Sequence, residues 1–255
     1  MSGYVRVVGL GPGPERWLTP EVSAALAEAS DLIGYKPYVE RLTVHSQQTL
    51  HASDNGDELQ RARTGLALAQ TGARVVIVSG GDPGVFAMAA AVFEAIEHGP
   101  PAWRGLDVSV LPGVTAMLAA AARLGAPLGN DFCAINLSDN LKPWSVIEKR
   151  LRLAAEADFV IALYNPRSKA RPDQLARAFD ILRVRRAAAA DIWVAFAKAI
   201  GRAQEAVHIT TLAAADPLLV DMQTLVLIGA SGTRYLERPD GGAWLYSPRR
   251  IAEVS

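Results

Sequence analysis

The sequence is poor in cysteine and lacks the motifs of several common enzyme classes. Cys133 is the single cysteine among the 255 residues, which excludes an internal disulfide and a cysteine-based metal cluster. There is no G-K-[ST] phosphate loop, no H-E-x-x-H zinc motif and no G-x-S-x-G nucleophile elbow, and the 4 histidines are scattered. Hydrolysis by a bound metal or a catalytic triad is therefore disfavoured, and we expect no metal site.

Long hydrophobic runs are also absent. The longest apolar stretches, 86–93 and 114–122, are stopped by Glu94 and Arg123, well short of the roughly 18 to 20 residues that a membrane span requires. The first residues lead straight into a strand pattern and show no signal-peptide pattern. We therefore expect a packed cytoplasmic protein with no membrane partner.

Charge is balanced overall but unevenly distributed. Residues 1–139 hold 9 Lys/Arg against 14 Asp/Glu, whereas residues 140–255 hold 17 against 12. The basic second half either attracts an anionic substrate or is an ordinary solvated surface. The basic residues form no long run and have no zinc or helix-turn-helix context, so we expect no nucleic-acid partner.

The most informative stretch is 75–86, VVIVSGGDPGVF. Its β-branched residues predict a strand buried on both faces, which ends at two glycines, an aspartate and a proline before an apolar helical segment. Gly80 and Gly81 lack a Cβ, so their amides can come close to a small molecule. Asp82 places a carboxylate at the carboxyl end of a parallel strand, where open α/β sheets bind ligands. The alternative is an ordinary strand-to-helix turn.

A second glycine-rich turn follows the first predicted strand, 4–10. The turn Gly9–Pro14 is not a dinucleotide fingerprint, because Pro12 and Pro14 remove two amide donors and the next helix starts later. Thr19 is the expected N-cap of that helix and Pro20 its first residue. We interpret the turn as a rigid ledge beside a binding cleft.

The remaining pattern alternates strands and helices and breaks near residue 120. Ser53 or Asp54 is expected to cap a helix over 56–70, and Thr115 to cap the helix after strand 106–111, with amides that favour anions. Cys133 is expected in the core. The other expected elements are a helix to about 29, strand 31–35, helix 86–98, strand 132–137, helix 145–155, strand 158–164, helix 174–186, strands 192–197 and 205–210, a last strand 225–228, and an apolar segment 244–246 that packs on the body or on a partner.

Taken together, these loops resemble the tetrapyrrole methylase family of S-adenosylmethionine-dependent methyltransferases. The resemblance covers nearly the whole chain and lies in VxxVGLGPG at 5–13, LTPEV at 18–22, SGGDPGVF at 79–86 and LPGVTA at 111–116. GYKxY at 34–38, LSDNLKPW at 137–144 and LYNPRSKAR at 163–171 are similar to the members that methylate corrin precursors in cobalamin biosynthesis. The family fold implies two α/β domains, 1–120 and 121–255, with the cofactor in the cleft between them, and a homodimer.

The resemblance also implies roles for individual residues, with S-adenosylmethionine as cofactor and S-adenosylhomocysteine as its product. Leu10 and Pro12 would border the cofactor, Gly80, Gly81 and Asp82 would hold its methionine and ribose parts, and Val85 and Phe86 would pack nearby. Thr115 and Ala116 would bind from the start of their helix. The adenine would be enclosed by Leu163, Tyr164, Asn165 and Ala199. Ala199 stands where some relatives have a Gly-Thr pair, and Pro14 replaces an aspartate common after the G-P-G turn.

Methyl transfer from a sulfonium is an in-line displacement, so the protein mainly aligns the nucleophile and excludes water. By resemblance the nucleophile is C17 of a tetrapyrrole that carries several carboxylates. The expected substrate contacts are Ser138, Lys142, Arg167, Lys169 and Arg171; Asp82, Asp139 and Tyr164 are the candidates for acid or base chemistry. Two alternatives stay open: a methylase of the same fold for uroporphyrinogen or another corrin precursor, with or without cobalt, and a non-catalytic tetrapyrrole carrier.

Overall fold

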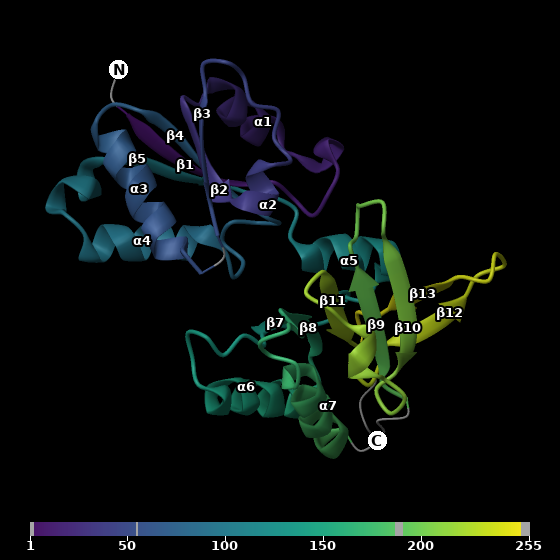
Figure 1. Cartoon of the computed structure of the whole chain (residues 1–255). Coiled ribbons are helices and arrows are strands. Elements are labelled where there is room, and N and C mark those ends of the chain that lie inside the picture. Colours follow the sequence, from purple (N-terminus) through teal and green to yellow (C-terminus); the bar gives the residue numbers. More distant parts are fainter. Residues whose placement is uncertain (1–2, 55, 187–190, 251–255) are drawn as a thin grey trace. The chain divides into compact units, whose positions relative to one another are not determined.

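A computed structural model describes residues 3–54, 56–186 and 191–250. The chain forms two compact units, Met1–Ala116 and Met117–Ser255, each with its own core (Figure 1). The division falls at the start of helix α5 (Ala116–Leu124), and the boundary expected from the sequence, at residue 120, lies inside this helix. We describe the units separately as unit 1 and unit 2.

Unit 1 is built on a parallel five-stranded sheet in the order β3-β2-β4-β1-β5. The strands are β1 (Tyr4–Gly9), β2 (Asp31–Tyr35), β3 (Thr49–Ser53), β4 (Arg74–Ser79) and β5 (Asp107–Leu111). Gly9 pairs with Ser79 and Val8 with Leu111, so the three adjacent strands β4, β1 and β5 end at one edge. The loops that the sequence singled out therefore leave the same edge of the sheet.

Helices cover both faces of this sheet (Figure 1). On one face, Val75 and Ile77 of β4 pack with α3 (Glu58–Gln70) and α4 (Met88–His98). On the other, Val76 and Val78 pack with α1 (Pro20–Glu28). This alternation confirms the prediction that β4 is buried on both faces. A short helix α2 (Lys36–Val39) and the 3-10 turns Glu15–Trp17 and Pro101–Gly105 complete the unit.

The predicted helix ends of unit 1 were right in one case and wrong in another. The Thr19 hydroxyl accepts a hydrogen bond from the Val22 amide at 3.2 Å, which confirms it as the N-cap of α1. The cap expected at Ser53 or Asp54 is wrong, because α3 begins later and Asp57 precedes it without a side-chain cap. The Ser53 hydroxyl and the Asp54 carbonyl instead accept hydrogen bonds from Arg61.

Unit 2 contains a mixed sheet in the order β10-β9-β11-β8-β7. Strands β7 (Phe132–Asn136) and β8 (Val160–Tyr164) are parallel, and the other pairs are antiparallel: β9 (Trp193–Lys198), β10 (Ala206–Thr211) and β11 (Thr224–Ile228). Helices α6 (Trp144–Glu156) and α7 (Gln174–Arg185) pack on this sheet around Phe179 and Leu151. Cys133 lies half-buried against the same core, and burial raises the pKa of its thiol.

The expectation that residues 225–228 form the last strand is wrong. Two further strands, β12 (Arg234–Glu237) and β13 (Ala243–Tyr246), form a small sheet with β6 (Gly125–Ala126). Leu245 is buried and the Tyr235 ring stacks on Trp193 at 4.6 Å between centroids, so the apolar segment 244–246 packs on its own unit. The sequence did not predict these short strands, because Gly, Pro and charged residues typical of turns surround them.

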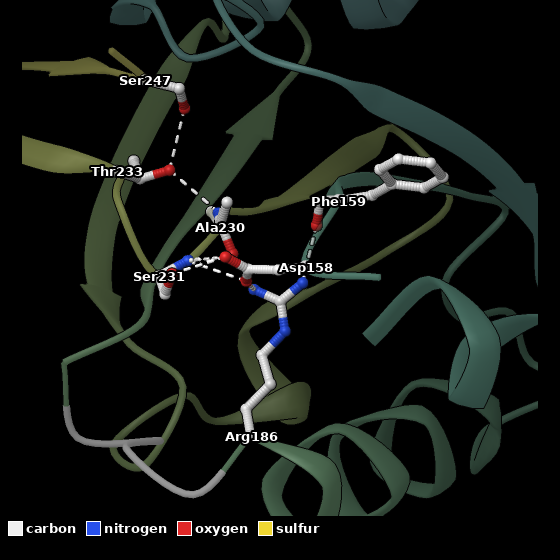
Figure 2. Close-up of polar contacts among 8 residues, drawn as sticks. Asp158, Phe159, Arg186, Ala230, Ser231, Thr233 and Ser247 are labelled. Carbon is white, nitrogen blue, oxygen red and sulfur yellow. Dashed lines mark hydrogen bonds and ion pairs between the residues drawn. The ribbon is translucent and has the colours of Figure 1, made fainter. Parts of the chain in front are cut away.

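The buried guanidinium of Arg186 connects three elements of unit 2 (Figure 2). Arg186, just after α7, donates hydrogen bonds to the carbonyls of Phe159 and Gly229 and lies 3.6 Å from the Asp158 carboxylate. The Ser231 amide donates to Asp158 at 2.9 Å. Burial lowers the pKa of Arg186, and Asp158 opposes this shift. These contacts join the start of β8, the end of β11 and the end of α7.

No helix in the described ranges is both long and apolar enough to span a membrane.

Candidate functional site

Three loops meet at the carboxyl edge of the sheet of unit 1. They follow β1, β4 and β5 and span residues 9–14, 80–86 and 112–116. Gly11 and Gly81 each donate an amide hydrogen bond to the other's carbonyl at 3.1 Å, which joins the first two loops in an isolated antiparallel bridge. The ledge predicted at 9–14 is therefore fixed directly to the loop predicted to bind a ligand.

Glycine is required where these backbones touch. A Cβ on Gly113 would lie 2.4 Å from the Gly81 carbonyl oxygen, and a Cβ on Gly9 would lie 2.6 Å from the same atom. Gly81 also has φ +67°, in the left-handed region that side chains disfavour. The close approach leaves three main-chain segments side by side.

Asp82 connects the second and third loops. Its Oδ1 accepts a hydrogen bond from the Gly84 amide at 2.8 Å, and its Oδ2 accepts one from the Gly113 amide at 3.0 Å. The first bond is a local Asx-type turn and the second spans 31 residues of chain. The carboxylate thus fixes the loops relative to each other, and each of its oxygens keeps capacity for a further hydrogen bond.

The other predicted cofactor residues of unit 1 lie around this junction. The Cβ position of Gly81 is 3.6 Å from Thr115 Cα, and Thr115 is buried directly before α5. Phe86 is 48% exposed and has φ +51°, which is unusual for an aromatic residue. Leu10 donates its amide to the Ser79 carbonyl at 2.9 Å. On the side of β2, the Tyr38 ring packs against Gly80, where a Cβ would lie 2.7 Å from the ring.

A second group of loops leaves the parallel pair β7 and β8 of unit 2. The Asn136 side-chain oxygen accepts hydrogen bonds from the Ser138 amide at 2.9 Å and from Asn165 Nδ2 at 3.1 Å. Two more side-chain contacts join the same loops: Arg171 donates to Asn140 at 2.7 Å, and Gln174 donates to Asp139 at 3.2 Å. The segments 136–144 and 165–174 are therefore tied at three places.

The cations predicted to bind substrate differ in their surroundings. Lys142 donates to the Ser138 carbonyl at 3.1 Å, and burial, followed by Arg150, lowers the pKa of its ammonium while Asp139 opposes the shift. Arg167 donates to the Pro172 carbonyl at 3.3 Å, and Arg171 is held by Asn140. Lys169 is exposed. Arg167 and Arg171 thus help to shape the loop in addition to any contact with a ligand.

The residues expected around the adenine lie at one edge of the sheet in unit 2. Strands β8 and β9 flank β11 and run in the same direction, so Asn165 and Ala199 emerge at the same edge. Both have left-handed backbones, with φ +50° and +48°, which non-glycine residues adopt at some cost. The Tyr164 hydroxyl accepts a hydrogen bond from the Met117 amide at 3.1 Å. Leu163 is fully buried, main chain included, where it pairs with Val226 and Ile135 inside the sheet.

Sequence reasoning missed several polar residues at these edges. Asn136 directly ends a strand, and its residue type was the available signal, since asparagine often turns the chain back on itself. Gln174 is only 8% exposed, and its Oε1 lacks a hydrogen-bond partner among the described residues. Arg61 is buried beside Tyr35 and Tyr38 at the edge of unit 1. The last two lie on helices, where the sequence gives no sign of what they contact.

Unit 1 has a cavity next to one of the predicted cofactor residues. A cavity of about 250 Å³ in unit 1 lies beside α1 and is lined by Leu10, Gly13, Leu26, Leu32, Arg41 and other residues. Of the predicted cofactor residues, Leu10 alone is part of its described lining. No group of three or more His, Cys, Asp or Glu side chains within the described ranges is placed to hold a metal ion.

Residues 5–216 match the family described as "Tetrapyrrole (Corrin/Porphyrin) Methylases". The chain belongs to the tetrapyrrole methylase family, as its loops predicted. It is 54% identical to a "Precorrin-3B C(17)-methyltransferase" from Sinorhizobium sp, over 100% of both chains. It is also 42% identical, over 89% of this chain and 92% of the relative, to a "Probable cobalt-factor III C(17)-methyltransferase" from Salmonella typhimurium.

Solved structures of methyltransferases also match this chain. The structure of "the methyltransferase CobJ" matches with a TM-score of 0.91 and 53% identity over 97% of this chain and 100% of that one. Uroporphyrin-III C-methyltransferase from Thermus thermophilus, complexed with S-adenosylhomocysteine, matches with a TM-score of 0.62 at 21% identity, over 89% and 92% of the two chains, and supports the fold alone. These matches confirm the predicted α/β tetrapyrrole methylase fold and a methyltransferase of this family.

Proposed function

We propose that the chain transfers a methyl group from S-adenosylmethionine to C17 of precorrin-3B, with ring contraction to precorrin-4, in cobalamin biosynthesis. The observation that carries the proposal is the 54% identity to a precorrin-3B C17-methyltransferase over the full length of both chains. The match covers the whole length and so spans the loops 137–144 and 163–171, whose sequences resemble those of this branch of the family.

The loops of unit 1 fit the cofactor chemically. Gly80 and Gly81 offer main chain without side chains, which suits the close approach of a flat or extended molecule. Asp82 keeps acceptor capacity for hydroxyl or ammonium groups beyond the two amides it already binds. We therefore propose that these residues hold the methionine and ribose parts, and that the other predicted residues of unit 1 surround them: Leu10, Pro12, Val85, Phe86, Thr115 and Ala116.

For the adenine we propose the edge of unit 2 formed by residues 163–165 and 199. The left-handed backbones of Asn165 and Ala199 end the ladder of the sheet at this edge. The Ala199 amide and carbonyl already bond to Gln223 and Arg202, so Ala199 would contribute through van der Waals contact. Leu163 is fully buried, so a contact between it and the adenine would require this edge to open. This part of the proposal is tested by substitution of Asn165 and measurement of adenine-nucleoside affinity.

When bound, the cofactor supplies an electrophilic methyl group on a sulfonium. The residues of this chain then have three tasks: they hold the reacting carbon in line with the methyl group, exclude water, and bind the carboxylates of the tetrapyrrole. We propose Ser138, Lys142, Arg167, Lys169 and Arg171 for the last task. Asp82, Asp139 and Tyr164 remain the candidates for moving a proton, and each already has a hydrogen-bond partner that orients it.

The decisive experiment is turnover. The purified protein is incubated with methyl-labelled S-adenosylmethionine and precorrin-3B, and the products are separated and weighed by mass spectrometry. We expect label in the tetrapyrrole, a mass gain of one methylene group, and one S-adenosylhomocysteine for each tetrapyrrole methylated. Tetrapyrrole binding without any consumption of the methyl donor would contradict the proposal and favour a carrier.

A second candidate substrate is cobalt-factor III, because of the 42% identity to the Salmonella relative named for it. The same assay with cobalt-factor III in place of precorrin-3B compares kcat/KM for the two. A higher kcat/KM for cobalt-factor III would identify that compound as the substrate and would leave the proposed methyl transfer unchanged. Exchange of the loops 138–144 and 166–171 with those of the Salmonella relative, which leaves Asn165 in place, is expected to change this ratio and to leave cofactor affinity unchanged.

A further inference from the structure

Arg61 is a buried cation at the ligand-facing edge of unit 1. It lies in the first turns of α3 and is 5% exposed. Its Nε donates to the Ser53 hydroxyl at 2.8 Å, its Nη2 to the Asp54 carbonyl at 2.8 Å, and its Nη1 to the Met88 sulfur at 3.2 Å. Ser53 ends β3, and Met88 begins α4 just after the loop 80–86. The guanidinium therefore sits where two of the elements that frame this edge meet.

The hydrogen bonds of Arg61 leave its charge poorly compensated. Within the described ranges no carboxylate forms an ion pair with it, and one of its three partners is a thioether, which is a weak acceptor. A guanidinium has one N–H on Nε and two on each terminal nitrogen, so among the described residues one N–H on Nη1 and one on Nη2 have no acceptor. Burial lowers the pKa of Arg61, and the nearby carboxylates of Glu58 and Asp57 only oppose this shift.

An uncompensated buried charge is costly to a protein and is retained when it serves another purpose. Two unused N–H groups on neighbouring terminal nitrogens match the two oxygens of a carboxylate, which arginine binds in a bidentate manner. Ser53, Tyr35 and Tyr38 are half-buried and Asp54 is exposed, so the guanidinium lies just beneath the surface. Its surroundings therefore suit an anionic group that enters from outside.

The position of Arg61 separates it from the proposed cofactor loops. In the sheet order β3-β2-β4-β1-β5, Arg61 contacts the end of β3, whereas Asp82 and Gly113 join the ends of β4 and β5. Tyr38 lies between these regions, packed on Gly80 and edge-to-face with Tyr35 at 5.3 Å between ring centroids. A ligand that reaches both regions has to be large and to carry more than one anionic arm.

We propose that Arg61 is the centre of a subsite that binds one peripheral carboxylate of the tetrapyrrole substrate. The inference rests on the proposed function and assigns one carboxylate contact of the substrate to unit 1. Tyr35 and Tyr38 flank the guanidinium and direct the arm toward it.

The test compares Arg61→Met and Arg61→Lys with Arg63→Met, an exposed arginine on the same helix that gives the same change of net charge. Calorimetry measures the affinity for S-adenosylhomocysteine, and fluorescence quenching measures the affinity for uroporphyrin III, a stable tetrapyrrole with carboxylate arms. Thermal unfolding checks that each variant is folded. Turnover of precorrin-3B by the parent is measured first, so that failure of the proposed function is recognised independently.

We expect Arg61→Met to weaken uroporphyrin binding and to raise the KM for precorrin-3B about tenfold, the effect of one charged hydrogen-bonded contact. Arg61→Lys should recover part of this loss, since it keeps the charge but not the fork of donors. Arg63→Met and the affinity for S-adenosylhomocysteine should stay unchanged. A folded Arg61→Met variant with parental tetrapyrrole affinity would overturn the proposal, as would an equal loss for both ligands or a loss confined to S-adenosylhomocysteine.

Discussion

Replacement of Asp82 by alanine is expected to weaken cofactor binding through the arrangement of the loops as well as through a lost contact. The carboxylate accepts hydrogen bonds from the Gly84 and Gly113 amides at 2.8 and 3.0 Å, and the second bond fixes the loop after β4 to the loop after β5. Hydrogen bonds to a charged group contribute about 1.5 to 3 kcal/mol each. Asp82 is half-buried, so solvent screening reduces the combined effect to about 2 kcal/mol.

This energy sets the size of the expected effect. A loss of about 2 kcal/mol corresponds to about a thirtyfold change in an equilibrium constant. If the two loops are ordered only by these bonds, the binding-competent arrangement becomes rarer by the same factor, and the apparent Kd rises in proportion. The bridge between Gly11 and Gly81 holds part of the arrangement independently. We therefore expect the Kd for S-adenosylhomocysteine to rise about fivefold to thirtyfold in Asp82→Ala.

Asp82→Asn separates the two bonds, because one side-chain oxygen remains as an acceptor and the other becomes a donor that faces an amide. It should lie between the parent and the alanine variant. Isothermal titration of S-adenosylhomocysteine measures all three, with Glu94→Ala, an exposed carboxylate on α4, as control. Parental affinity in Asp82→Ala would refute the argument that this carboxylate organises the site.

Two further predictions concern the ion pair between Arg6 and Asp107 and the hydrogen bonds by which Asn136 joins two loops of unit 2. Arg6 forms two hydrogen bonds with the Asp107 carboxylate, and these, against an opposing effect of burial, lower the pKa of the Asp107 carboxyl below its usual value. The pair therefore stabilises the fold above about pH 4 and loses this effect as the pH falls through the lowered pKa. At pH 7 we expect Asp107→Asn to be less stable than the parent by at most about 1 kcal/mol, and near pH 2 we expect the two to be equally stable. Urea unfolding at both pH values measures the difference. Asn136→Ala should raise both the KM for the tetrapyrrole and the Kd for S-adenosylhomocysteine several-fold, because Asn136 holds the Ser138 amide and the Asn165 side chain. Asn130→Ala, which removes only a bond to the next amide, should behave as the parent in the same assays.

The sequence was sufficient to predict the loops of unit 1 and the strands that hold them. In β4 the residues 75–78 are all β-branched, which is typical of a strand buried on both faces, and the glycines that follow mark the end of the strand. In contrast, β3 has the sequence TLHAS and lies at the edge of the sheet with exposed residues. Its pairing with β2 depends on neighbours far along the chain, and no local pattern indicates it.

The contacts that complete the site depend on how separate strands, helices and loops pack together, and this is why they escaped prediction. Arg61 was an ordinary charged residue on a predicted helix, and Ser53 and Asp54 were assigned to a cap because capping is the commonest role of such residues before a helix. The structure shows the three in contact with each other, since β3 and α3 place them together. The same holds for Gln174 and Asp139, which are 35 residues apart.

A common device holds the loops at both edges. In each unit a short polar side chain near a strand end accepts the amide of the residue two positions later: Asp82 binds Gly84, and Asn136 binds Ser138. The same side chain then accepts a second hydrogen bond from the loop after a different strand, from Gly113 or from Asn165. The local bond fixes where the side chain points, and the distant bond uses that direction to position a neighbouring loop. Because Asp82 is charged and uses both oxygens whereas Asn136 is neutral and uses one, we infer that the loops of unit 1 are the more sensitive to loss of their acceptor.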